Sequence, residues 1–193
     1  MVDKINRELK YEYPKFLTRL INDLEKYEYK GKPLITIPNV FDKVPFNRHH
    51  GTTFKDFEIF DSQSIQNIFG KSNNKDDSIL ILNFWATYLT TINRRILRTY
   101  YDSDKKPSTS TFEETVYFFK CLKELCLKDV EKIEKYIDED LSKLFLIEVK
   151  NILSEDLSPF NDWGKLIVHF GKIESCLVKF VKESGHQSLT CNF

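Results

Sequence analysis

The most hydrophobic segment of the chain, from Ser78 to about Tyr101, repeats its apolar residues at every third or fourth position. One side of this segment carries Ile81, Trp85, Tyr88, Leu89, Ile92 and Ile96, and a narrow polar stripe carries Asn83, Thr87, Thr90, Arg94 and Arg98. A spacing of three and four is the period of an α-helix, and so narrow a polar stripe indicates burial on most sides. We therefore expect this helix near the centre of the fold.

The same periodicity recurs along the chain and predicts an all-α, single-domain bundle of about five long helices plus one short helix. The long helices are expected at about 3–29, 78–101, 111–127, 130–152 and 159–184, and the short one at about 61–70. The third long helix is apolar on two sides. The fourth is expected to turn one face inward, formed by Val130, Ile133, Ile137, Leu141 and Leu144. A proline at the first helical position predicts that the last helix begins at Ser158-Pro159.

Residues 30–55 interrupt the helical pattern with three prolines, Pro33, Pro38 and Pro45, around short β-branched runs. Proline favours extended backbone in the residue before it, so this stretch is predicted to be an extended arm. The expected organisation is one domain over 1–193, with an N-terminal helix at 1–29, the arm at 30–55, a helical core at 56–185 and a tail at 186–193.

Composition restricts the class of protein. The chain is 41% hydrophobic, with 16 Phe and 9 Tyr, so a real core is expected without disulfides. Lys+Arg and Asp+Glu both number 29, which argues against a broad nucleic-acid or membrane footprint. The N-terminus lacks the apolar stretch of a signal peptide, and no apolar run approaches the roughly 20 residues of a membrane span. We expect an intracellular protein, cytoplasmic or nuclear, with no membrane contact.

The scarcity of some residues bears on origin. Ala86 is the only alanine and there are six arginines, whereas lysine, asparagine and isoleucine abound. The scarce residues have GC-rich codons and the abundant ones AT-rich codons. This bias indicates an AT-rich genome, such as that of a large DNA virus or a parasite.

Arg48, His49 and His50 form the stretch that most resembles a chemical site. Histidine titrates near neutrality, so a hydrolytic pair is one interpretation, but no nucleophile stands at a telling spacing. A metal site needs three or four converging ligands, and adjacent side chains of an extended loop point apart. We expect no catalytic residue, metal or cofactor here, and interpret "NRHHG" as a polar turn that is a candidate for ligand or partner contacts.

Arg94, Arg95 and Arg98 are half of the arginines and are followed by two tyrosines and two lysines. A short basic and aromatic patch of this kind suits phosphates, RNA or an acidic partner helix. The alternative is structural, because cations near a helix C-terminus interact favourably with the helix dipole.

"NDWGKLIVHF" at 161–170 resembles the N-W-G-R helix start of regulators of the Bcl-2 family, with Asn161, Trp163, Gly164 and Lys165 in matching places. Asp162 is an insertion relative to that pattern, and lysine replaces the arginine. The resemblance implies an all-helical fold with an apolar groove that binds partner helices.

These features favour a non-enzymatic protein-protein interaction or regulatory protein, or a helical subunit of a complex, whose partner is another protein. One alternative is a nucleic-acid-binding or processing factor that uses Arg48, His49, His50 and the Arg94–Arg98 stripe. The other alternative is a divergent Bcl-2-like groove protein.

Overall fold

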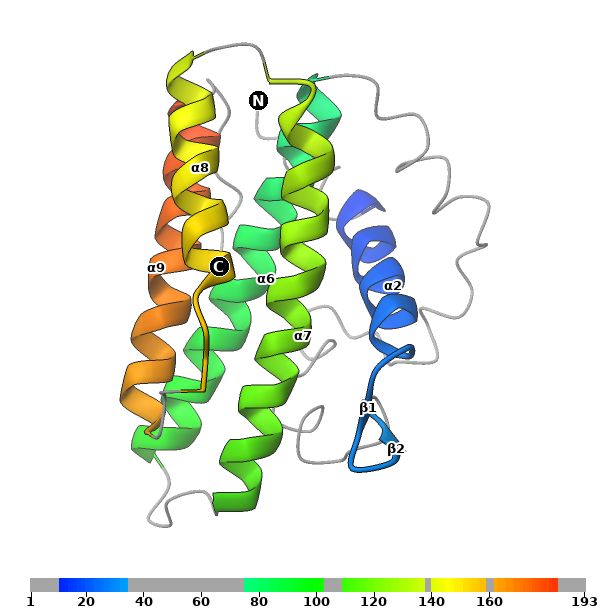
Figure 1. Ribbon diagram of the computed structural model, residues 1–193, viewed down its shortest axis with the longest axis vertical. Coiled ribbons are helices and arrows are strands. Elements are labelled where there is room, and N and C mark those ends of the chain that lie inside the picture. Colours follow the sequence, from blue (N-terminus) through cyan, green and yellow to red (C-terminus); the bar gives the residue numbers. More distant parts are fainter. Residues whose placement is uncertain (1–10, 35–74, 103–108, 138–139, 159–161, 184–193) are drawn as a thin grey trace.

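The computed structural model describes residues 11–34, 75–102, 109–137, 140–158 and 162–183 (Figure 1). Over these ranges the protein is all-α, as predicted, with five helices: α2 (Tyr13–Leu24), α6 (Lys75–Asp102), α7 (Thr109–Glu134), α8 (Asp140–Ser154) and α9 (Trp163–Glu183). Two short strands, β1 (Glu28–Tyr29) and β2 (Lys32–Pro33), pair in antiparallel fashion. The predicted arm beyond residue 34, the short helix at 61–70 and the tail lie outside the described residues.

Helices α6 to α9 form a four-helix bundle. Each helix packs against the next along the chain, and α6 closes the ring through extensive contact with α9. Helix α2 contacts α6 and α7 and lies beside α7, on the side away from α8 and α9 (Figure 1). Helix α7 therefore has packed neighbours on two sides, which accounts for its two apolar faces.

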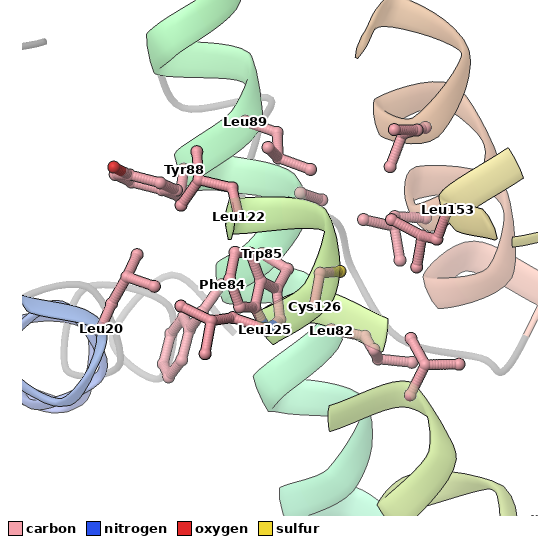
Figure 2. Packing of buried hydrophobic residues seen from close by; sticks show 14 of the residues in the cluster. Leu20, Leu82, Phe84, Trp85, Tyr88, Leu89, Leu122, Leu125, Cys126 and Leu153 are labelled. Atoms are coloured by element: carbon pink, nitrogen blue, oxygen red, sulfur yellow. The ribbon is translucent and has the colours of Figure 1, made fainter. Parts of the chain in front are cut away.

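The core is aromatic and continuous from α2 to α9. Every residue of α6 from 81 to 90 is buried, in agreement with the narrow polar stripe of this segment. Leu20 of α2 meets side chains of α6 and α7, including Phe84 and Leu125 (Figure 2). Across the bundle, the rings of Phe119 on α7 and Phe170 on α9 stack with their centroids 3.8 Å apart. This stacked pair joins α7 and α9, which lie diagonally opposite each other in the four-helix bundle.

Helix α2 ends before the predicted helix at 1–29 does. It has Pro14 in its first turn, where a missing N–H is tolerated, and it ends at Leu24. The chain then turns back through Lys30 (φ 50°) and Gly31 (φ 74°) to form the β1–β2 hairpin. A two-residue turn with two positive φ angles matches the twist of paired strands. The predicted arm therefore begins as a hairpin, not as extended chain.

A buried ion pair joins α2, α6 and α7. The Arg19 guanidinium donates two hydrogen bonds to the Asp129 carboxylate, one of them from Nη1 to Oδ1 at 2.8 Å. Trp85 Nε1–H donates to Asp129 Oδ2 at 2.8 Å. A carboxylate removed from water is stable only when it is paired and hydrogen-bonded, and here three N–H groups from two other helices supply that need.

The predicted single helix at 130–152 is wrong. Helix α7 continues to Glu134, and α8 begins anew at Asp140. On one continuous helix, Ile133 and Ile137 would lie almost opposite Leu146 and Val149, at 100° per residue. All four are buried against the same bundle, because the chain turns back between Ile137 and Leu146. The turn changes which residues of α8 face the core, so Leu144, expected inside, is 63% exposed.

The predicted start of the last helix at Ser158-Pro159 is also wrong. Helix α9 begins at Trp163, and the carboxylate of Asp162 accepts a hydrogen bond from the backbone N–H of Lys165 at 2.8 Å. That bond satisfies one of the free N–H groups of the first turn. Ser158 instead closes a turn, in which its N–H donates to Asp156 Oδ1 at 3.0 Å.

Replacing Asp129 with alanine should lower the free energy of unfolding by about 3–5 kcal/mol, because the buried Trp85 indole would lose its acceptor and Arg19 would lose its paired hydrogen bonds. Chemical denaturation followed by circular dichroism measures this loss. The control is Glu131→Ala, an exposed site on the same helix, which should change stability by less than about 0.5 kcal/mol. A loss below about 1 kcal/mol for Asp129→Ala would contradict the assigned role of the ion pair.

Candidate functional site

The site predicted from the sequence lies largely beyond what the structure describes. Arg48, His49 and His50 fall outside the described residues. Arg94, Arg95 and Arg98 lie on α6, on a helix as predicted, but their side chains are not among those described. A meeting of the two segments in space therefore stays a prediction.

Metal and thiol chemistry have little support in the described part of the chain. Its histidines, cysteines and carboxylates form no group of three or more that could hold a metal ion. Burial raises the pKa of the Cys121 thiol to about 12, and burial together with Glu148 raises that of Cys176 to about 11. Only the deprotonated thiolate acts as a nucleophile or a metal ligand. These two thiols stay protonated near neutral pH and are therefore unreactive.

One compact cluster of titratable groups is present inside the bundle, formed by Lys123 of α7, His169 of α9 and Glu155 at the end of α8. The Lys123 ammonium lies 2.9 Å from His169 Nε2 and also donates to the backbone carbonyl of Glu155. His169 Nδ1 lies 3.2 Å from Glu155 Oε2. Lys123 is only 5% exposed, whereas the Glu155 side chain is about half exposed. The cluster thus reaches from the core to the surface.

The length of α8 explains why a lysine can be buried there. Helix α8 has 15 residues against 26 in α7, so it ends partway along its neighbour (Figure 1). Lys123 lies under this end and binds the carbonyl of Glu155, the residue that follows α8. A cation at a helix C-terminus satisfies a free carbonyl and interacts favourably with the helix dipole. The buried ammonium therefore caps α8.

Burial governs the protonation of this cluster. Burial and the positive charges of Lys123 and Lys172 together lower the pKa of His169 to about 4, against the opposing effect of Glu155. Burial likewise lowers the pKa of Lys123 to about 8, against the attraction of Glu155 and Asp156. At neutral pH the imidazole is neutral and the amine is charged. Because an ammonium only donates, His169 must accept at Nε2 and carry its proton on Nδ1, facing Glu155.

This arrangement limits what the cluster can do chemically. A histidine oriented by a carboxylate resembles the base of a catalytic triad, but a general base needs its other nitrogen within reach of the substrate. In this protein Lys123 occupies that nitrogen. The geometry therefore supports a structural role, in which the cluster holds the end of α8 against α7 and α9.

The sequence interpretation did not identify Lys123 or Glu155 and assigned His169 no role. Two of these three residues nevertheless stand at positions in the sequence that indicate a buried polar group. Lys123 stands in the apolar series of α7, between Phe119 and Cys126 at spacings of four and three. His169 stands beside Phe170, on the apolar side of α9. A charged or titratable residue on the buried stripe of a helix indicates a partner inside the core. Glu155 has no such signal.

The segment that resembles the Bcl-2 helix start has a local structural explanation. The Trp163 ring meets Phe112 of α7 edge-on, with the centroids 5.1 Å apart. Asp162, the residue inserted relative to the family pattern, caps α9. A Cβ added to Gly164 would lie 3.2 Å from the capping carboxylate, so a small residue fits this turn. Packing and capping account for the tryptophan, the aspartate and the glycine.

The free energy of unfolding should fall by about 3 kcal/mol more between pH 6.5 and pH 4 in the native chain than in His169→Gln. The unfolded histidine takes up its proton near pH 6.5, whereas folded His169 resists it down to about pH 4, so stability rises with pH across this window. Glutamine can donate and accept hydrogen bonds at the same place but does not titrate. Denaturation at a series of pH values measures the difference, and parallel curves for the two proteins would refute the assignment.

Comparisons with protein-family models, curated proteins and solved structures find no match to this chain. No helix of the described residues is long and apolar enough to cross a membrane. The function of this protein therefore has to be inferred from its own residues and their geometry.

Proposed function

We propose that the protein acts by binding another protein, as an intracellular regulatory protein or as a subunit of a complex, and not by catalysis. The observation that carries the proposal is a pair of exposed apolar side chains on α8. Leu144 is 63% exposed and Ile147 is 49% exposed. They stand three residues apart, so they share one outward region of the helix.

The exposure of this pair follows from how α8 is packed. Helix α8 buries Leu146, Val149 and Leu153 against its neighbours, and this orientation turns Leu144 and Ile147 away from the core. The exposed residues of α7 over 112–134, in contrast, are all charged: Glu113, Lys120, Glu124, Lys128, Glu131 and Lys132. Two large aliphatic side chains in water are unfavourable for an isolated chain, and adjacent ones are typical of an interaction site.

A helix of the partner is the best occupant of this face. Apolar residues at positions i and i+3 on a helix are the pattern by which helices recognise each other. Complete burial of Leu144 and Ile147, now 63% and 49% exposed, would contribute about 2–3 kcal/mol. A micromolar complex needs about 8 kcal/mol, so the partner must also contact neighbouring surface.

The cysteines support the proposed compartment. Among the described residues, Cys121, Cys126 and Cys176 are all free thiols, as is usual in reducing compartments. The nucleic-acid alternative rests on Arg48, His49, His50 and the Arg94–Arg98 stripe. The side chains of these residues lie outside those that the structure describes, so this alternative stays a prediction.

The test places a photoreactive amino acid at Lys143, an exposed position one residue before Leu144, in the full chain expressed in its own cells. We expect one predominant protein adduct, which the double variant Leu144→Asn, Ile147→Asn should reduce at least about tenfold by removing the apolar contact. Quantitative mass spectrometry of the adduct measures the reduction.

The matched control is Asn151→Ser, Ser154→Asn, which alters two exposed polar positions of the same helix. This control should retain the adduct, and circular dichroism should show both doubly substituted chains folded. Equal loss of the adduct in the two variants, or no protein adduct at Lys143, would refute the proposal.

A further inference from the structure

The outward face of α9 is rich in lysine. Between Trp163 and Lys182, the exposed side chains of the helix are Lys165, Val168, Lys172, Ser175, Lys179 and Lys182. We call these six residues the lysine face. Two carboxylates lie near them: Glu174 is half-buried, and Glu183, the last residue of α9, is exposed.

Solvation alone does not explain this face. The exposed residues of α7 alternate in sign along the helix, from Glu113 to Lys132, so neighbouring charges there attract each other. The whole chain has a net charge of zero, so the lysine face is a local concentration of one sign. Like charges on one face repel each other until an anionic partner neutralises them.

Neutralisation within the described residues is incomplete. Lys165 pairs with the capping carboxylate, Nζ to Asp162 Oδ2, at 3.5 Å. Lys179 Nζ lies 4.7 Å from the ring centroid of Phe145 on α8. Among the described residues, no carboxylate forms an ion pair with Lys172 or Lys182. These two ammonium groups, together with Lys179, remain open to an outside acid.

The lysine face borders α8 on the side of Phe145. Lys179 reaches over to Phe145, which directly follows Leu144 in the chain. One turn further along α8, Glu148 raises the pKa of the half-buried Cys176 thiol of α9, so these two side chains also lie close together. Helices α8 and α9 thus lie side by side, with Leu144 on the outward side of α8 and the lysine face on the outward side of α9. Ile147 is two residues from Phe145, about 200° around the helix, so it lies on the side of α8 away from α9.

We infer that the partner segment bound at this surface is an acidic amphipathic helix, which places apolar side chains on Leu144 and carboxylates on the lysine face. The inference rests on the proposed function and specifies its partner. Positions 165, 168, 172, 175, 179 and 182 alternate in steps of three and four, the spacing of a seam along which one helix lies against another. Lys172 and Lys179 are a heptad apart, about 10 Å along the axis, and a second helix repeats its carboxylates at the same interval.

The chemistry of the surface favours an acidic protein over nucleic acid. The exposed residues of α8 from 143 to 154 and of the lysine face include no arginine and no aromatic side chain. Bidentate phosphate recognition uses arginine, and single-stranded nucleic acid needs aromatic platforms for its bases.

The test selects binders to the purified full chain from a library of helix-forming peptides of about 20 residues, with all surface positions randomised. We expect the enriched peptides to have net negative charge and apolar residues every three or four positions. Their affinity should fall at least about tenfold for Lys172→Glu, Lys179→Glu, and also when NaCl is raised from about 0.05 M to about 0.5 M.

The matched control is Lys128→Glu, Lys132→Glu, which makes the same change of net charge on α7 and should alter affinity by less than about twofold. Neutral or basic enriched peptides, or equal effects of the two charge reversals, would overturn the inference. Tighter binding of a thymidine 20-mer or of phosphatidylserine vesicles than of the selected peptides would also overturn it.

The variant Leu144→Asn, Ile147→Asn separates the two proposals. Peptides that lose affinity for this variant but not for Lys172→Glu, Lys179→Glu would preserve the α8 contact and refute the acidic partner. The opposite result would preserve the acidic partner and refute the α8 contact. Loss of affinity with both variants is the expected result.

Discussion

The buried carboxylate of Asp129 is the constraint on which the packing of α2, α6 and α7 depends. Hydrophobic burial is non-directional, so the apolar stripe of α2 would tolerate sliding along the bundle. A buried carboxylate restricts such sliding, because it must stay paired and fully hydrogen-bonded. Arg19 and Trp85 meet that need from two different helices, and the paired N–H groups of the guanidinium add a fixed geometry. The ion pair thus specifies where α2 lies.

Helix α7 is packed on two sides, and each side carries one buried charge. Asp129 faces α2 and α6, whereas Lys123 faces α9 and the end of α8. The two groups have opposite signs and need different partners, so exchanging the two sides of α7 would bury both without compensation. Such buried polar groups add less to stability than to the choice of one arrangement. Outside the core the surfaces also differ: α7 is mixed in charge, α8 carries an apolar pair, and α9 is basic.

Local patterns predicted the helices whose burial is consistent along their length. Helix α6 was expected at 78–101 and is found at Lys75–Asp102, because its periodicity is uninterrupted. The expectation failed where two helices meet. The apolar residues of 130–137 and those of 146–153 fall on opposite sides of one helix, a signal that the chain turns back, but helix propensity alone does not register it. The exposure of Leu144 follows from that turn, so the apolar pair on α8 was not predictable while one helix was assumed.

By itself, the sequence determined the fold class, the central helix and the presence of a large aromatic core, because periodicity and composition are properties of neighbouring residues. Only the tertiary structure decided which charged groups meet. Glu155 and His169 stand 32 and 46 residues from Lys123 along the chain, and the three come together because α8 ends partway along α7. The same holds for the surface shared by α8 and α9. Lys179 of α9 and Phe145 of α8 meet there although they stand far apart in the sequence.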